Sequence, residues 1–339
     1  MPFVLRILGA VLGTFVVLPL VSCSREGGRE VIVYVSEDQV FSEPILRDFE
    51  RETGIRVRAV FDTEEAKSAG VMNRLLAERN NPQADVYWAN EPIRAESLRQ
   101  HGMTSAYLSP AAADLPAEFK NLDGHWTGFS ARARVLLVHS DVAERPASVL
   151  DLAEPRYRGR VAIANPLFGT TTAEVAALFV AKGDDLGRAF LASLERNGIR
   201  VTSSNGESAD AVASGELDFS LVDSDDAVSR IRQGRAVEMV VPDQSDGAMG
   251  VFLVPNAVLI LRGAPHPEDA RRLVDYLLSP DTERKLAAAD CAQLPLHAGV
   301  APPRELPPIS ALRRLAPDTE RVAAKMEEIR PLLEEWSRR

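Results

Sequence analysis

The run VFLVPNAVLIL, from Val251 to Leu261, is almost wholly apolar and long enough to form one continuous buried strand. A second run, SARARVLLVH from Ser130 to His139, has a buried-strand pattern in which Arg132 and Arg134 precede the apolar residues. On both sides of these runs, strand-like and helix-like patterns alternate. We therefore predict two α/β units joined by two long apolar strands.

The first unit has the pattern strand, helix, strand, helix, strand. We expect its strands at 31–35, 55–59 and 85–88, one helix opening at Ser42-Glu43-Pro44, and another over 64–80. Short connections between such elements imply a parallel sheet covered by helices on both faces.

The second unit repeats this alternation. Its expected strands are 161–163 and 219–222, and its expected helices are 173–182 and 185–197. After the run at 251–261 we expect two amphipathic helices, 267–278 and 280–289, and a charged amphipathic helix over 318–339.

The first 22 residues have the pattern of a secretory signal peptide. A basic start is followed by an uncharged apolar run from Ile7 to Leu20, too short to span a membrane comfortably. The run ends in LVSC, which resembles the bacterial lipobox, so Cys23 is predicted to carry lipid and residues 23–30 to form a tether. The alternative is an ordinary cleaved signal with a cysteine nearby by chance.

The composition is that of an ordinary globular chain of two domains. The 339 residues are 45% hydrophobic and carry a formal net charge of −10, which argues against a nucleic-acid partner and mildly favours a cationic ligand. Only two cysteines are present, so lipidation of Cys23 leaves Cys291 without a disulfide partner.

Seven further stretches resemble one family when they are taken in order and spacing. They are FERETGIRV (49–57), PQADVYW (82–88), TGFSARARVLLVHS (127–140), YRGRVAIANPLFGTTT (157–172), SNGE (204–207), VPDQ (241–244) and VPNAVLILRGAPHPEDARRLVDYLLS (254–279). Over residues 31–295 the chain resembles the type II periplasmic binding proteins, and within them the ferric-ion-binding group.

This resemblance implies a fold of two lobes with mixed sheets, helices on both faces and a two-strand hinge. Lobe 1 would comprise 31–135 and 256–305, and lobe 2 would comprise 136–255 and 306–339. The ligand would bind between the lobes, where open α/β sheets place their sites. An exported, monomeric binding protein of this kind would work in the periplasm or on the outer cell surface, with the permease and ATPase of an ABC importer as partners.

The sequence departs from the iron-binding pattern after the strand at 219–222. The resemblance places two adjacent tyrosines there, but this chain has Asp223-Ser224-Asp225-Asp226. Carboxylates this close repel one another unless a cation or a proton compensates them, and hard cations prefer oxygen ligands. The alternative is that these residues only begin a helix, with the aspartates in its first turn.

In the first unit, polar residues follow the strands in the same way. Asn90 and Glu91 come after the strand at 85–88, and Glu37 comes after the strand at 31–35. We expect Asn90 and Glu91 to complete a metal site with the aspartates, and Glu37 to contact the ligand. A helix cap at Glu91 and a solvated loop at Glu37 are the alternatives.

A threonine-rich turn is the candidate anion site. The resemblance implies that an anion such as carbonate or phosphate completes the metal shell, and Gly169, Thr170 and Thr171 open a helix whose N–H groups and hydroxyls suit one. Asn205 and Arg132 are further candidates. A plain N-cap, and an arginine paired with a carboxylate, are the alternatives.

The sequence therefore predicts a binding protein for ferric iron or a related hard cation, without a resident cofactor. The same fold binding a polyamine, thiamine or phosphonate is one alternative. A carboxylate-dependent hydrolase is another, disfavoured because nothing supplies a nucleophile with an orienting base.

Overall fold

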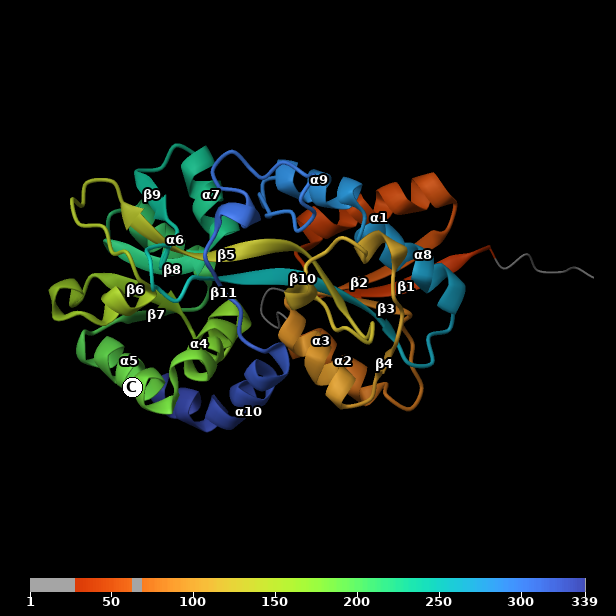
Figure 1. The fold of residues 1–339 in the computed structure, drawn as a ribbon, viewed down its shortest axis with the longest axis horizontal. Coiled ribbons are helices and arrows are strands. Elements are labelled where there is room, and N and C mark those ends of the chain that lie inside the picture. The colour runs from red at the N-terminus through yellow and green to blue at the C-terminus, as the bar shows by residue number, and fades with distance from the viewer. Residues whose placement is uncertain (1–27, 63–68, 339) are drawn as a thin grey trace, which may run out of the picture.

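The coordinates are a computed structural model that describes residues 28–62 and 69–338. The predicted signal peptide and Cys23 lie outside these residues. Two α/β lobes lie side by side, and the long strands β5 (Thr127–His139) and β10 (Val251–Leu261) run from one to the other (Figure 1). This confirms the predicted two-lobed fold.

Lobe 1 is built on a parallel core of three strands. In its centre β1 (Glu30–Val35) pairs with β2 (Arg56–Phe61) and β3 (Val86–Ala89), and β3 continues into β10 by antiparallel pairing. A short strand, β4 (Thr104–Ser105), also pairs with β10. The helices of this lobe are α1 (Gln39–Thr53), α2 (Ala69–Ala77), α3 (Pro92–Gln100), α8 (Pro267–Leu277) and α9 (Pro280–Ala288).

Lobe 2 repeats the arrangement. Its strand β8 (Phe219–Asp223) pairs in parallel with β6 (Val161–Ala164), which pairs with β7 (Arg200–Thr202), while β9 (Val237–Val240) pairs with β5. The helices are α4 (Gly169–Lys182), α5 (Asp184–Arg196), α6 (Asn205–Ala213) and α7 (Ser224–Arg232).

The sheet is continuous through the connection between the lobes. Its strands follow the order β2-β1-β3-β10-β5-β8-β6-β7, and one apolar cluster extends from Val33 through Ala133 to Val222. The β5–β10 register shifts between Pro255 and Asn256, opposite Ser130, which has a left-handed φ of 41°. The two connecting strands thus contain an irregularity at mid-length, as β-bulges produce.

The C-terminal helix α10 (Thr319–Trp336) follows a short strand, β11 (Arg314–Leu315), that pairs with β10. The helix packs against α4 of lobe 2 and also against α3 of lobe 1. At the second contact, Arg99 of α3 lies 3.3 Å from Glu320. The domain boundaries proposed from the sequence stay a prediction, and α10 touches both lobes.

Two predicted helix starts are wrong, and the first is that of α4, which begins at Gly169 rather than at Ala173. The helix α1 begins at Gln39, preceded by Asp38, rather than at Ser42, and Pro44 lies inside it. Ser42 does not cap the helix because its hydroxyl donates back to the carbonyl of Asp38 at 2.9 Å. In the described ranges no helix is long and apolar enough to cross a membrane.

Candidate functional site

The carboxyl ends of β1 and β3 in lobe 1 meet the carboxyl end of β8 in lobe 2 between the lobes. Glu37 follows β1, Asn90 follows β3, and Asp223 ends β8. Arg132 lies among them on β5, where it pairs with Val254 of β10. We call Glu37, Asn90, Arg132, Asp223 and Asp225 the interlobe site.

Arg132 is the buried cation of this site. Its guanidinium donates to the backbone carbonyl of Asn90 and lies 4.0 Å from the Glu37 carboxylate, with 7% of the side chain exposed. Burial opposes its charge, but the carboxylates of Glu37, Asp223, Asp225 and Asp38 raise the pKa of Arg132 above its ordinary value. It therefore stays charged, and its Nε has no hydrogen-bond acceptor among the described residues.

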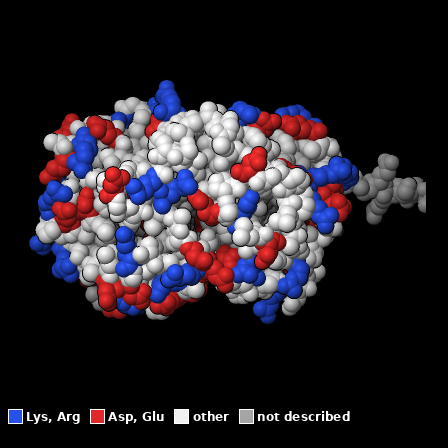
Figure 2. Space-filling view, viewed as in Figure 1, with Lys and Arg blue, Asp and Glu red and all other residues white. Residues whose placement is uncertain are grey.

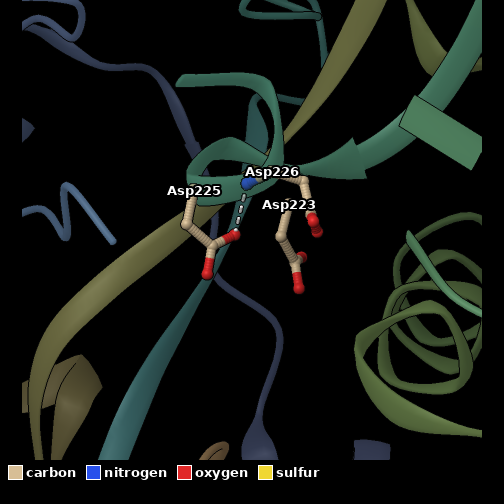
Figure 3. Close-up of side chains that lie close together, drawn as sticks. All are labelled: Asp223, Asp225 and Asp226. Carbon is tan, nitrogen blue, oxygen red and sulfur yellow. Dashed lines mark hydrogen bonds between the residues drawn. The ribbon is translucent and has the colours of Figure 1, made fainter. Parts of the chain in front are cut away.

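The acidic cluster lies where β8 passes into α7 (Figure 3). One oxygen from each of Asp223, Asp225 and Asp226 lies within 4.8 Å of the others, and the three carboxylates point to the same side of the helix start. The predicted helix start is therefore present as well, because Asp225 and Asp226 occupy the first turn of α7. Asp226 lies 3.5 Å from Arg230 on its own helix, whereas Asp225 has no ion pair at this distance among the described residues.

Asp225 is a carboxylate of the cluster whose proton affinity is raised. Burial and the nearby charge of Asp223 raise the pKa of Asp225 to about 6, although Arg132 opposes the shift. Near neutral pH it is ionised against an unfavourable field, so a cation beside it would be stabilised.

Asp223, in contrast to Asp225, forms an ion pair with a buried arginine. Arg134 has no exposed side-chain surface and donates through Nη1 to Asp223 Oδ1 at 2.9 Å and through Nε to Glu174 Oε2 at 2.8 Å. Burial acts against ionisation of Asp223, but Arg134, Arg132 and the hydroxyl of Thr170 together lower its pKa. Asp223 is therefore a carboxylate with a permanent internal partner.

The threonine turn predicted to hold an anion meets the carboxylate of Asp223. Thr170 Oγ1 donates to Asp223 Oδ2 at 2.8 Å, Asn205 Nδ2 donates to the same oxygen at 3.3 Å, and Thr171 Oγ1 accepts from Arg134 at 3.3 Å. Gly169 has a φ of 61°, and a Cβ there would meet no atom within 4 Å. Glycine at this position therefore serves the left-handed backbone conformation and not a close approach of another group.

Of the first-lobe candidates, Glu91 is the N-cap residue of helix α3. Its carboxylate caps α3, accepting from Ile93 N at 2.6 Å and Arg94 N at 3.1 Å, so the helix-cap alternative describes what the structure shows. Asn90 contributes its backbone carbonyl to Arg132. Glu37 is buried rather than solvated, and it is the first-lobe carboxylate nearest to Arg132.

A buried amide chain was missed by sequence reasoning. Trp88 Nε1 donates to Asn256 Oδ1 at 3.1 Å, Asn256 Nδ2 donates to Gln293 Oε1 at 2.8 Å, and Gln293 Nε2 donates to Glu37 Oε1 at 2.9 Å. The chain orients Glu37 from the connecting strand. An asparagine inside an apolar strand was the available indication, because buried polar groups require partners.

The comparisons with known proteins agree with this architecture. A family model described as bacterial extracellular solute-binding protein matches residues 84–315, more than half of the chain. Iron uptake protein A1 of Synechocystis sp. is 27% identical over 289 residues, covering 80% of this chain and 77% of that protein. A putative 2-aminoethylphosphonate-binding periplasmic protein of Salmonella paratyphi A is 26% identical over 263 residues, covering 76% and 74%.

The fold is matched by a solved structure. The apo ferric ion-binding protein A of Pasteurella haemolytica superimposes with a TM-score of 0.79 at 24% identity, covering 91% of this chain and 98% of that one. At this identity the likeness shows the two-lobed fold alone. Because the family model matches more than half of the sequence, the chain belongs to the family of bacterial extracellular solute-binding proteins, and its two-lobed fold is consistent with this.

Proposed function

We propose that this protein is an extracytoplasmic solute-binding protein of an ABC importer, and that its interlobe site carries a hard cation, ferric iron first. The cation is cargo to be delivered to the permease and ATPase. We infer that Asp225 and Asp226 supply its second-lobe oxygens and that Glu37 supplies a first-lobe oxygen. Glu91 is left out of this ligand set because it caps α3.

The balance of charge at the interlobe site carries this proposal. Four carboxylates, those of Glu37, Asp38, Asp223 and Asp225, act on the single guanidinium of Arg132. Asp223 also has Arg134 as a partner, but Arg134 is shared with Glu174. Burial and the charge of Asp223 nevertheless raise the pKa of Asp225, although Arg132 is near, so a cation bound beside Asp225 would compensate its charge.

Similarity supports iron as the first cation to test. The relative from Synechocystis is named for iron uptake, and the solved structure from Pasteurella haemolytica is a ferric ion-binding protein. Aspartates in place of the tyrosines predict a ferric complex that is nearly colourless, since phenolate ligation produces the visible charge-transfer band.

The deciding experiment begins with native mass spectrometry and elemental analysis of freshly purified protein. Calorimetry with ferric citrate should then compare the wild type with the double variant Asp225→Asn/Asp226→Asn. Loss of both carboxylates should cost about 2–5 kcal/mol of binding free energy, which raises Kd at least about 30-fold.

A matched control removes the same charge elsewhere. The double variant Asp246→Asn/Asp290→Asn neutralises two aspartates with more than 90% of their side chains exposed, so its metal affinity should equal that of the wild type. If the cleft variant keeps full metal affinity while both variants are folded by circular dichroism, the acidic cluster only begins a helix and the assignment is wrong.

A second candidate ligand is an aminophosphonate, and one observation favours it. Arg132 is a buried guanidinium whose Nε lacks an acceptor among the described residues, as a site for an anionic group would provide. The relative from Salmonella is named for 2-aminoethylphosphonate binding. In this arrangement the carboxylates would hold the amine.

Arg132→Gln separates the two candidates. Removing the guanidinium should strengthen binding of a metal cation, because it removes a like charge, and should weaken binding of 2-aminoethylphosphonate, because it removes the partner of the phosphonate. Arg132→Lys keeps the charge and controls for loss of fold. Tight phosphonate binding by the wild type, with no metal bound, would put this candidate first.

We also propose that Cys23 tethers the protein to a membrane. The support is the LVSC sequence at the end of the apolar run. Intact mass of detergent-extracted protein should show a chain beginning at Cys23 with added acyl mass, and an unmodified N-terminus elsewhere would contradict the tether.

A further inference from the structure

We propose that Asp223 is a built-in anion, which fills the anion-attracting corner of lobe 2 so that this protein takes its cation without a free phosphate or carbonate. The corner is formed by Arg134 on β5, Thr170 in the first turn of α4 and Asn205 at the start of α6. The inference rests on the proposed function for the cation, but the occupancy of the corner can be tested without any metal.

The donors of the corner are used by the Asp223 carboxylate. Arg134 Nη1 reaches Oδ1 at 2.9 Å, while Thr170 Oγ1 and Asn205 Nδ2 reach Oδ2 at 2.8 and 3.3 Å. Arg134 Nη1 also donates to Thr170 Oγ1 at 3.1 Å and to Asn205 Oδ1 at 3.2 Å. The other Arg134 hydrogen bonds go to Glu174 Oε2 at 2.8 Å, to Thr171 Oγ1 at 3.3 Å and to the Leu221 carbonyl at 3.4 Å. These are the side chains that a phosphate at two helix N-termini would require.

The contacts are also sealed from solvent. The Arg134 side chain is fully buried, and 7% of the Asp223 side chain is exposed. A free anion would have to displace an ion-paired carboxylate from a buried site and leave it uncompensated, which is costly. The tethered carboxylate, in contrast, is held at the corner by the chain itself and loses no translational freedom there.

This arrangement has a consequence for the choice of ligand. Asp223 points with Asp225 toward the same side of the α7 start (Figure 3). The negative charge at the corner therefore belongs to the protein and cannot be exchanged. The ligand class that fits is a cation arriving alone, and an anion added to the solution should not strengthen its binding.

The test compares inorganic phosphate with no phosphate, first in the wild type and without metal. Phosphate should leave the melting temperature of the wild type unchanged. In Asp223→Ala the emptied corner should bind phosphate, and saturation should raise the melting temperature by about 2–4 °C for each kcal/mol of linked binding energy. Adding Arg134→Gln to Asp223→Ala should abolish this rise.

Two further variants keep the test decisive. Asp210→Ala removes one carboxylate from helix α6, which also carries Asn205 of the corner. The Asp210 side chain is 68% exposed and pairs with Arg230, so this variant should gain no phosphate response. Asp223→Asn preserves the shape of the side chain if Asp223→Ala does not fold, and its phosphate response should be weaker than that of the alanine variant but above that of the wild type.

The metal experiment then separates this inference from the proposed function. If ferric ion binds the wild type, phosphate or carbonate should change its Kd less than about twofold, whereas in Asp223→Ala the same anions should lower Kd about tenfold or more. A wild type whose melting temperature or metal affinity depends on phosphate overturns the inference. Failure of all metals to bind, with the phosphate response confined to the Asp223 variants, overturns only the cation proposal.

Discussion

Protonation of the Asp225 carboxylate should be seen in ligand binding. Burial beside Asp223 raises its pKa to about 6, so its carboxylate is increasingly protonated as the pH falls below that value. A proton and a cation compete for the same oxygens. The affinity of the wild type for ferric ion should therefore decrease by up to about tenfold per pH unit below pH 6.

Asp225→Asn should remove this step, and it supplies the control. The chelator that delivers the iron also titrates, but the ratio of wild-type to variant affinity cancels its contribution. The ratio should approach one as the pH falls through 6 toward 4. A ratio that is independent of pH would show that Asp225 does not ligate the cation.

In the absence of metal, the raised pKa means that ionised Asp225 lowers the free energy of unfolding. This decrease in stability disappears progressively as the pH falls below 6 and the Asp225 carboxylate becomes protonated.

At the scale of the elements, the irregularity in β5 is a local feature that can be tested by itself. Ser130 has a φ of 41°, a conformation that costs a non-glycine residue about 1–3 kcal/mol. Its backbone N–H donates to Glu283 at 2.8 Å and its carbonyl accepts from Asn256 at 2.9 Å, so the surroundings hold it there. The strained residue lies where β5 and β10 shift register between the lobes.

Ser130→Gly should therefore be neutral or raise the free energy of unfolding by about 1 kcal/mol, whereas Ser130→Val should lower it by about 2 kcal/mol or more. Urea denaturation measures both. Ser220 in β8 is the matched control, because it is also buried with an unbonded hydroxyl but has an ordinary strand conformation. Ser220→Gly should destabilise, and if Ser130→Gly destabilises equally, Ser130 is not strained.

At the scale of the whole molecule, charge is distributed differently inside and outside. Acidic and basic side chains are interspersed over the visible face (Figure 2). Between the lobes, in contrast, several carboxylates surround the one buried guanidinium of Arg132. The described form encloses the interlobe site, since Glu37, Asn90, Arg132 and Asp223 are all buried. Without a cation, repulsion among the buried carboxylates favours separation of the lobes about β5 and β10.

Small-angle scattering should accordingly give a smaller radius of gyration with saturating metal than without it. The double variant Asp225→Asn/Asp226→Asn, which lacks the repelling charges, should show little difference between the two conditions. An unchanged profile for the wild type at a metal concentration that calorimetry shows to be saturating would contradict closure of the lobes.

The sequence by itself determined the elements and their connection. The apolar run at Val251–Leu261 and its partner at Ser130–His139 become the paired strands β10 and β5, because runs rich in valine, leucine and isoleucine suit strands that are buried on both faces. Local chemistry also placed polar residues at the ends of β1, β3 and β8. The beginning of α1 was misplaced because Ser42 bonds backward to Asp38 instead of capping forward.

Only the tertiary structure decided which polar residues meet. Sequence spacing grouped Asp223 with Asp225 and Asp226. The fold instead brings Arg134 of β5, Thr170 at the start of α4 and Asn205 at the start of α6 to the Asp223 carboxylate, which they pair inside the protein. Likewise, Gln293 reaches Glu37 across 256 positions of sequence. Periodicity reports the surroundings of one segment. Partners separated by long stretches of chain are set by burial, because polar groups taken out of water need hydrogen-bond partners that other elements can supply.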